Sequence, residues 1–172
     1  LSLITISNDQ EPVQDIKFGL QKLVEIALRA VSPAINDPYT AINSMNHITK
    51  ILSLLGQKHL EIPFHYDKHQ QLRVIFEKPS FSDYLYECFY QIRHYAKEDV
   101  SVMAALLKGL SFIAQGNSPF IKGVIWEFSL YIVEGLREVN WLSKDKEFLN
   151  LQLKMLANVC NKQKREKELM LR

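Results

Sequence analysis

The segment Ser32-Pro33-Ala34-Ile35-Asn36-Asp37-Pro38 separates two stretches that both have helical spacing of apolar residues. Pro33 ends the first stretch, since the residue before a proline is disfavoured in the helical region. Asp37-Pro38 begins the second, because Asp is a favoured N-cap and Pro loses no hydrogen bond at the first helical position. A connector this short predicts an antiparallel pair of helices.

Working outward, the same spacing predicts four further helices and a change of period predicts one hairpin. Alternating apolar residues on both sides of Asp67–Gln71 indicate a β-hairpin near 61–77. The four helices are expected to begin at the Ser80/Asp83 capping box, at Glu98-Asp99, at Pro119 and at Ser143. The predicted fold class is therefore mainly α: a bundle of about six helices with one small β-hairpin inserted between helices two and three.

Two of the predicted helices carry features that bear on packing. The helix after Asp99 is apolar nearly all round, which is typical of a helix in the middle of a bundle or at a subunit contact. In the helix after Ser143, the apolar stripe expected to be buried is Phe148, Leu151, Met155, Leu156 and Val159.

Aromatic residues give a second indication of contacts. The third helix contains four tyrosines that point around more than one face, so some of them must be partly exposed: Tyr84, Tyr86, Tyr90 and Tyr95. Trp126 or Tyr131 on the fifth helix must also be partly exposed. Amphipathic aromatics of this kind suit contacts between proteins.

The chain divides into three parts. Residues 1–13 are predicted to be an extended lead-in from a preceding segment, residues 14–160 a helical domain, and residues 161–172 a polar helical tail, frayed or exposed to solvent. With 172 residues, one domain is the expectation. Because the sequence begins at Leu1 without an initiator Met, we expect a piece of a longer protein.

Charge and composition exclude some classes of protein. The formal net charge of +2 is too small for a protein that grips phosphate backbones, so no nucleic-acid partner is predicted. No stretch of about 20 apolar residues is present to span a bilayer. Two cysteines, Cys88 and Cys160, make no disulfide framework and indicate a reducing compartment.

The connector is also the candidate ligand site. A helix N-terminus offers free N–H groups and a positive dipole end, which can hold an anion or a small polar ligand. The alternative is that Asp37 merely caps the helix and Asn36 satisfies backbone groups of the loop. The candidate binding residues are Arg29, Ser32, Asn36, Asp37, Tyr39, Thr40 and Arg93.

The sequence gives little indication of a metal site or of a catalytic site. His59, His65 and His69 straddle a predicted turn instead of sharing a helix face, so they are interpreted as solvated loop residues and no metal site is predicted. Cys88 lies on a buried stripe without a basic neighbour and is interpreted as a core residue. No catalytic residues and no cofactor are predicted, and enzymatic activity stays open only as a special case of ligand binding at the connector.

Two stretches resemble a known bacterial family. They are Phe18-Gly19-Leu20-Gln21-Lys22-Leu23-Val24-Glu25-Ile26-Ala27-Leu28-Arg29-Ala30 with the connector that follows, and Leu72-Arg73-Val74 with Phe81-Ser82-Asp83 and Gln91-Ile92-Arg93-His94-Tyr95. The chain is similar from about Gln14 to Ile113 to the family of predicted membrane proteins called domain of unknown function 2254. The resemblance implies that this chain is the carboxy-terminal soluble domain, following a half that carries transmembrane helices.

Two functional hypotheses follow. The first is a non-catalytic, regulatory or oligomerising domain of a bacterial inner-membrane protein, lying on the cytoplasmic side. Its expected partners are its own transmembrane region and further copies of itself, and it would touch the membrane only through the missing segment. The alternative is a small-ligand or anion-binding domain, with its site at the Asn36-Asp37-Pro38 connector.

Overall fold

The structure, a computed structural model, describes residues 16–58, 64–75 and 79–171. The predicted lead-in over 1–13 lies outside the described residues. The elements in chain order are α1 (Ile16–Ala30), α2 (Pro38–Gln57), β1 (Phe64–Tyr66), β2 (Leu72–Ile75), α3 (Phe81–Ala96), α4 (Val100–Ala114), α5 (Pro119–Arg137), α6 (Ser143–Val159) and the 3₁₀-helix η1 (Gln163–Glu168). The predicted mainly α fold with one hairpin between the second and third helices is confirmed.

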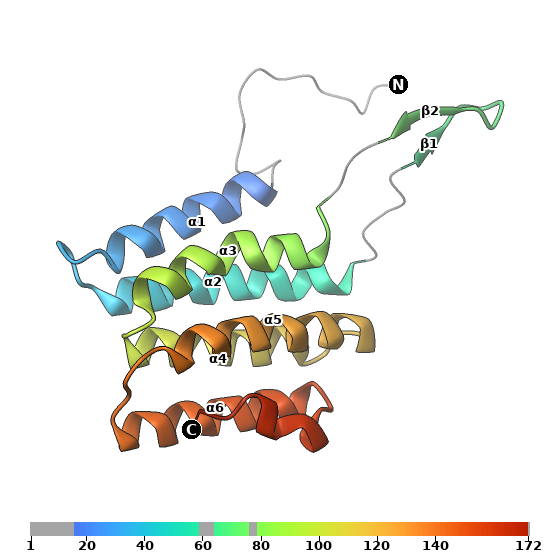
Figure 1. Cartoon of the computed structure of the whole chain (residues 1–172). Helices are drawn as coiled ribbons and strands as arrows, with labels where there is room; N and C mark the ends of the chain where they lie inside the picture. Colours follow the sequence, from blue (N-terminus) through green and yellow to red (C-terminus); the bar gives the residue numbers. More distant parts are fainter. Residues whose placement is uncertain (1–15, 59–63, 76–78, 172) are drawn as a thin grey trace.

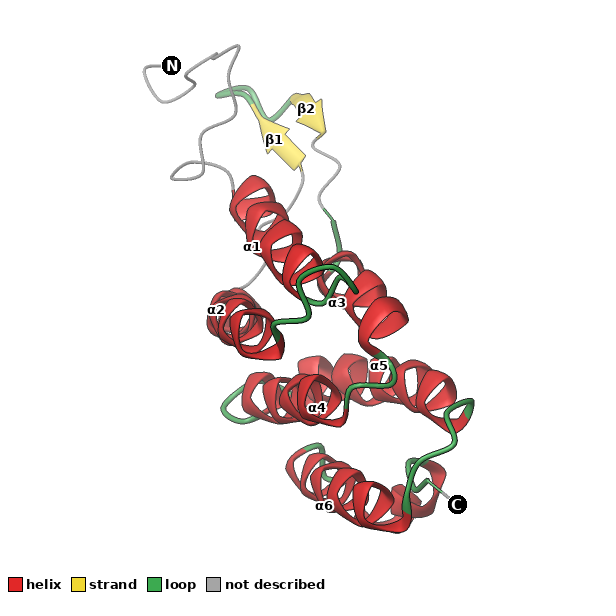
Figure 2. Cartoon of the chain, turned by 90° about the vertical axis from the view of Figure 1, so that its left-hand side faces the viewer, coloured by secondary structure: helices red, strands yellow, loops and turns green. Residues whose placement is uncertain are grey.

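The six α-helices form two layers (Figures 1 and 2). α1, α3 and α5 follow one another in one layer, which we call the odd layer, and α2, α4 and α6 in the other, the even layer. α4 contacts α2 and α6 within its own layer and α3 and α5 across it, so it lies in the middle of the bundle. The nearly all-apolar composition of α4 is explained by this position.

Helix starts follow the capping chemistry expected from the sequence. The Asp37 side chain caps α2, and Ser80 and Asp83 form a capping box at α3. Asp99 accepts hydrogen bonds from two backbone N–H groups of α4, and Ser118 accepts one from Ile121 at the start of α5. The expected cap at Ser143 is wrong: Leu142 is the N-cap of α6 and supplies no side-chain hydrogen bond.

The buried face of α6 also differs from the prediction. Phe148, Leu151 and Met155, expected in the core, are between 42% and 54% exposed. Leu156 is buried as predicted, and the other buried residues of α6 are Leu149, Gln152, Leu153 and Ala157. α6 carries apolar side chains on two faces, and helical periodicity does not reveal which of them meets α4.

The carboxy-terminal residues are anchored rather than frayed. η1 is a polar 3₁₀-helix, and Leu169 and Leu171 beyond it are buried. The Arg137 guanidinium donates a hydrogen bond of 2.6 Å to the Glu168 carbonyl oxygen, and the Asn150 amide exchanges two hydrogen bonds with the backbone of Leu171. The expectation of a frayed tail missed these leucines because two isolated apolar residues make no helical stripe.

The hairpin is antiparallel, and its turn is held by one carboxylate. Asp67 accepts hydrogen bonds from the backbone N–H groups of His69 and Gln71 and from the Arg73 side chain at 2.8–3.0 Å. Over the described residues, no helix combines the length and the apolar character needed to cross a membrane.

Candidate functional site

The connector between α1 and α2 is closed by its own hydrogen bonds. The Asn36 and Asp37 N–H groups donate to the carbonyl oxygens of Ser32 and Ala30 at 2.8 Å, and the Ser32 hydroxyl donates to the Arg29 carbonyl at 2.7 Å. Asn36 adopts a positive φ of 49°, which Asn tolerates better than most residues. The backbone groups of this loop are thus largely used by the loop itself.

The Asp37 carboxylate occupies the N-terminus of α2. One oxygen accepts the Thr40 N–H at 3.1 Å and the other accepts the Thr40 hydroxyl at 2.6 Å. These hydrogen bonds, the one from the hydroxyl first, hold the pKa of the Asp37 carboxyl below its usual value. The negative group that a helix N-terminus attracts is therefore already supplied by the chain.

The structure brings together six of the seven predicted site residues. Arg29, Ser32, Asn36, Asp37, Tyr39 and Thr40 all lie on the connector or the helix ends beside it. Arg93 reaches away from them: its guanidinium lies 4.4 Å from the centre of the Tyr131 ring on α5. Gly135 of α5 leaves the room for this arginine, since a Cβ there would meet the guanidinium.

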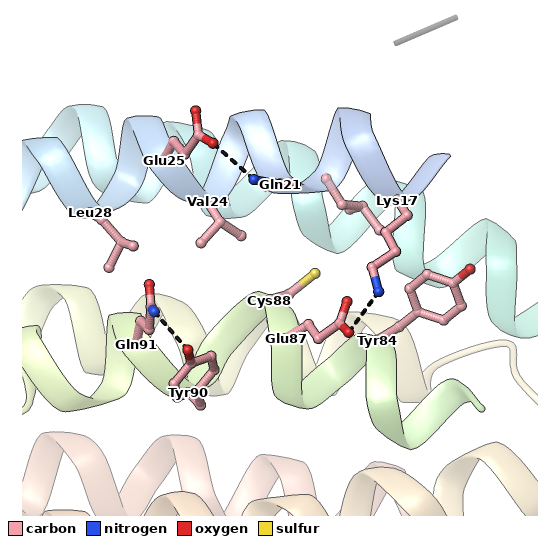
Figure 3. A pocket seen from close by; sticks show the side chains of 11 residues that line it. Lys17, Gln21, Val24, Glu25, Leu28, Tyr84, Glu87, Cys88, Tyr90 and Gln91 are labelled. Atoms are coloured by element: carbon pink, nitrogen blue, oxygen red, sulfur yellow. Dashed lines mark hydrogen bonds and ion pairs between the residues drawn. The ribbon is translucent and has the colours of Figure 1, made fainter. Parts of the chain in front are cut away.

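A cavity of about 330 Å³ lies between α1 and α3 and was not predicted (Figure 3). Leu20, Val24, Leu28 and Cys88 give it an apolar lining. Around them, Lys17 forms an ion pair of 2.9 Å with Glu87. Because the Lys17 and Glu87 side chains are paired with each other, the cavity is mainly an apolar slot whose charged edge residues are already neutralised.

The thiol of Cys88 does not supply a nucleophile to this cavity. Burial, and after it the charge of Glu87, raise the pKa of the Cys88 thiol to about 12. At neutral pH the sulfur is therefore protonated, and the thiolate is the reactive form. The interpretation of Cys88 as a core residue agrees with this geometry.

A second hollow lies between α3 and α5 and is lined by aromatic side chains. We call it the α3–α5 groove; it measures about 630 Å³ and includes Ser82, Tyr86, Phe120, Gly123, Val124, Glu127, Phe128 and Tyr131. The Tyr86 ring stacks on Tyr90 at 4.8 Å and meets Tyr131 at 5.8 Å. Phe120, at the first turn of α5, stands 74% exposed at the groove.

The sequence predicted only some of the exposed aromatic residues of this groove. It expected Trp126 or Tyr131 to be partly exposed, and Tyr131 is half-buried while Trp126 is fully buried. Phe120 was not singled out, because the groove beside it forms only where α3 packs against α5. The only local signal was a large aromatic residue directly after the Ser118-Pro119 helix start.

Metal binding finds no support in the described part of the chain. Among those residues, no group of three or more His, Cys, Asp or Glu side chains is placed to hold an ion. His69 is exposed on the hairpin turn, and His59 lies outside the described residues.

Comparison with known proteins identifies a family. Residues 1–111 match the family described as "Predicted membrane protein (DUF2254)". Uncharacterised proteins of Mycobacterium bovis and Mycobacterium tuberculosis are each 44% identical over 102 residues, or 59% of this chain. The match spans 20% of the length of these relatives. No solved structure matches the chain. With well over half of its residues matched, this chain belongs to the family of predicted membrane proteins with domain of unknown function 2254.

Proposed function

We propose that this chain is a non-catalytic interaction domain of a bacterial inner-membrane protein and that it pairs with a second copy of itself through the α3–α5 groove. The observation that carries the proposal is Phe120, a large apolar side chain that is 74% exposed beside a hollow of about 630 Å³. A projection and a hollow on the same face are what a two-fold symmetric contact requires, because each protomer then offers both parts to the other.

The walls of the groove are suited to receive an aromatic ring. Val124 and Phe128 line it, and the rings of Phe128 and Tyr131 lie 5.6 Å apart in a tilted arrangement. Aromatic side chains held by one another lose little conformational entropy on binding, which favours an interface anchored by rings. Phe120 would enter the groove of the partner, where it would be shielded from water.

A second hollow extends the same surface past Phe120. It measures about 560 Å³, is lined by Phe81, Ser118, Ile121 and Val124 among others, and also includes Phe120. Phe120 therefore stands between two hollows, and a partner ring has apolar surface to cover on both sides. This arrangement supports a contact that extends beyond one side chain.

The state of the polar groups supports a non-catalytic role. Lys17 and Glu87 are paired with each other, and Asp37, Asp83 and Asp99 are used as helix caps. Burial raises the pKa values of both cysteine thiols, to about 12 for Cys88 and about 11 for Cys160. These groups serve the fold, so the proposal assigns the domain to binding and assembly.

The proposal also places the domain on the cytoplasmic side, joined to the transmembrane region of its own protein. The family description supports the membrane context. The two cysteines are free and buried, which suits a reducing compartment. Self-association of such a domain would bring the attached membrane regions together.

The experiment is light scattering during size-exclusion chromatography of the wild type, Phe120→Asp and Leu142→Asp. Leu142 is the matched control, because it is 75% exposed but lies at the start of α6 away from the groove. We expect a dimer for the wild type and for Leu142→Asp, and a monomer for Phe120→Asp. A wild-type monomer at all concentrations, or equal effects of both substitutions, would contradict the proposal.

The connector remains the alternative proposal, as a site for an anion or a small ligand. Two exposed side chains beside the start of α2, Arg29 and Tyr39, support it, whereas the cap by Asp37 opposes an anion. Thermal unfolding with inorganic phosphate and with a metabolite panel tests it. A ligand-dependent rise in the melting temperature that Asn36→Ala abolishes would support the site, and an unchanged melting temperature would leave the connector a structural turn.

A further inference from the structure

The outer face of the even layer carries a row of exposed apolar side chains ringed by lysines. We call this surface the even-layer face. Its large apolar members come from all three helices of the layer: Leu54 of α2, Phe112 of α4, and Phe148, Leu151 and Met155 of α6. Each is at least 42% exposed. None of them lines the α3–α5 groove, which consists of residues from α3 and α5 only.

Contacts between the helices place these side chains at one level. Gly109 of α4 lies against Thr49 of α2, and the Asn117 amide donates a hydrogen bond to the Ser53 carbonyl, so the two helices run parallel in matching register. This register places Leu54 within about one helical turn of Phe112 along the layer. The stacking of α2, α4 and α6 in one layer is visible in Figure 2.

The exposed apolar side chains of α4 lie next to those of α6. The Lys108 ammonium group lies 5.7 Å from the centre of the Phe148 ring. One helical turn further along each helix come Phe112 on α4 and Leu151 on α6, with Met155 one turn beyond Leu151. The apolar row therefore crosses the whole layer.

The charges of this face are almost all positive. The exposed charged side chains of α2, α4 and α6 are four lysines and one acid: Lys50, Lys108, Lys144, Lys154 and Glu147. Glu147 is paired with Lys144 at 3.0 Å. α2 and α4 contain no Asp or Glu at all. The odd-layer helices carry charges of both signs, with six Lys and Arg residues beside five acids: Glu25, Asp83, Glu87, Glu127 and Glu134.

From this pattern we infer that the even-layer face binds the surface of a bilayer that contains anionic phospholipid. Leu, Phe and Met side chains enter the boundary between headgroups and acyl chains, while lysines extend toward the phosphates. Charge complementarity selects this partner over a second copy, since like-charged even-layer faces would repel each other. A domain that belongs to a family of predicted membrane proteins has such a surface close by.

The inference is separate from the proposed dimer, because it uses the opposite layer. A pair formed through the α3–α5 groove would leave the even-layer face of each protomer uncovered. Sequence reasoning expected membrane attachment only through the missing segment, and the even-layer face adds a direct contact between this domain and the lipid.

Co-sedimentation with vesicles tests the inference, using phosphatidylcholine vesicles with and without phosphatidylglycerol. We expect the wild-type chain to bind the mixed vesicles at low salt, to bind less at high salt, and not to bind pure phosphatidylcholine. Lys108→Glu with Lys154→Glu should weaken binding at least about tenfold. The matched control, Lys164→Glu with Lys167→Glu, makes the same charge change on η1 and should bind like the wild type.

The apolar part is tested with Phe112→Ser combined with Leu151→Ser, which keeps every lysine and should also weaken binding. Phe120→Asp should still bind the vesicles, so failure of the dimer and failure of the lipid contact are distinguishable. No binding to anionic vesicles, or equal loss in the Lys108/Lys154 and Lys164/Lys167 pairs, would overturn the inference. A change of oligomeric state in Phe112→Ser with Leu151→Ser, without any vesicle binding by the wild type, would show instead that the face is a protein contact.

Discussion

Gly109 is the residue on which the close approach of α2 and α4 depends. A Cβ at this position would lie 2.6 Å from the Thr49 Oγ1, and Thr49 is buried. Alanine gains about 1 kcal/mol of helix propensity over glycine, whereas overpacking a core contact costs about 1–3 kcal/mol. The two effects oppose each other, so the residue at position 49 should decide whether Gly109→Ala stabilises or destabilises the chain.

We predict that Gly109→Ala is more favourable by at least about 1 kcal/mol in a Thr49→Ala background than in the wild type. Urea unfolding of the four proteins in this cycle measures the coupling. Gly123 lines the α3–α5 groove, so Gly123→Ala serves as the control in the Phe120→Asp background, which is expected to be monomeric. Nothing lies within 4 Å of its Cβ, and the alanine should stabilise the chain. Equal effects of Gly109→Ala in both backgrounds would contradict the packing.

Cys88 predicts a specific dependence of stability on pH. Its pKa is raised by burial to about 12 in the folded chain, from an ordinary value of 9.0. Because the folded state holds the proton more tightly, this contribution to stability is complete below pH 9 and is lost as the pH rises toward 12. Unfolding free energies measured across this range should fall less steeply in Cys88→Ala than in the wild type. If the unfolding free energy falls equally steeply with pH in both proteins, the pKa of the Cys88 thiol is not raised by folding.

At the scale of the elements, α6 tests the observed burial against the sequence-based expectation. Leu153 is fully buried and Leu151 is half exposed, although they are two residues apart on the same helix. Leu153→Ala should lower the free energy of unfolding by about 2–5 kcal/mol, and Leu151→Ala by less than about 1 kcal/mol. Chemical denaturation measures both. A larger loss of stability for Leu151→Ala than for Leu153→Ala would contradict the observed burial and favour the face that the sequence predicted.

The contrast between helix starts and helix faces shows what the sequence can predict. The caps at Asp37, Ser80 and Asp99 depend on neighbouring residues along the chain, so local chemistry identified them. The buried side of α6 depends on where α4 lies, and helical spacing carries no information about that. The same reason separates Arg93 from the connector: its direction is set by Tyr131 and Gly135 of α5.

The candidate sites also differ in whether their residues are close together in the sequence. The connector was predictable because all its polar groups lie within nine residues, Ser32 to Thr40. The α3–α5 groove and the even-layer face were not, because each is assembled from residues of different helices. The sequence indicated that tyrosines such as Tyr86 had to be partly exposed, but not which residues they would face.

At the scale of the whole molecule, the two layers assign different contacts to opposite faces. The odd layer presents the aromatic α3–α5 groove with Phe120, and the even layer presents lysines around an apolar row. Together the two proposals describe a domain that pairs with a second copy through one face while its other face lies against lipid. No reacting group is needed for such a role: Asp37, Asp83 and Asp99 serve as helix caps, and Lys17 and Glu87 are paired with each other.

In the proposed dimer, Phe120 of one protomer lies in the groove of the other, near Glu127. Sedimentation equilibrium of the wild type, Phe120→Asp, and Phe120→Asp with Glu127→Lys tests it most directly. We predict a reversible dimer for the wild type, a monomer for the single variant, and a dimer again for the double variant, because the new Asp would meet the partner's new Lys. A wild-type chain that stays monomeric at every concentration, or a double variant that stays as monomeric as the single one, would contradict the account.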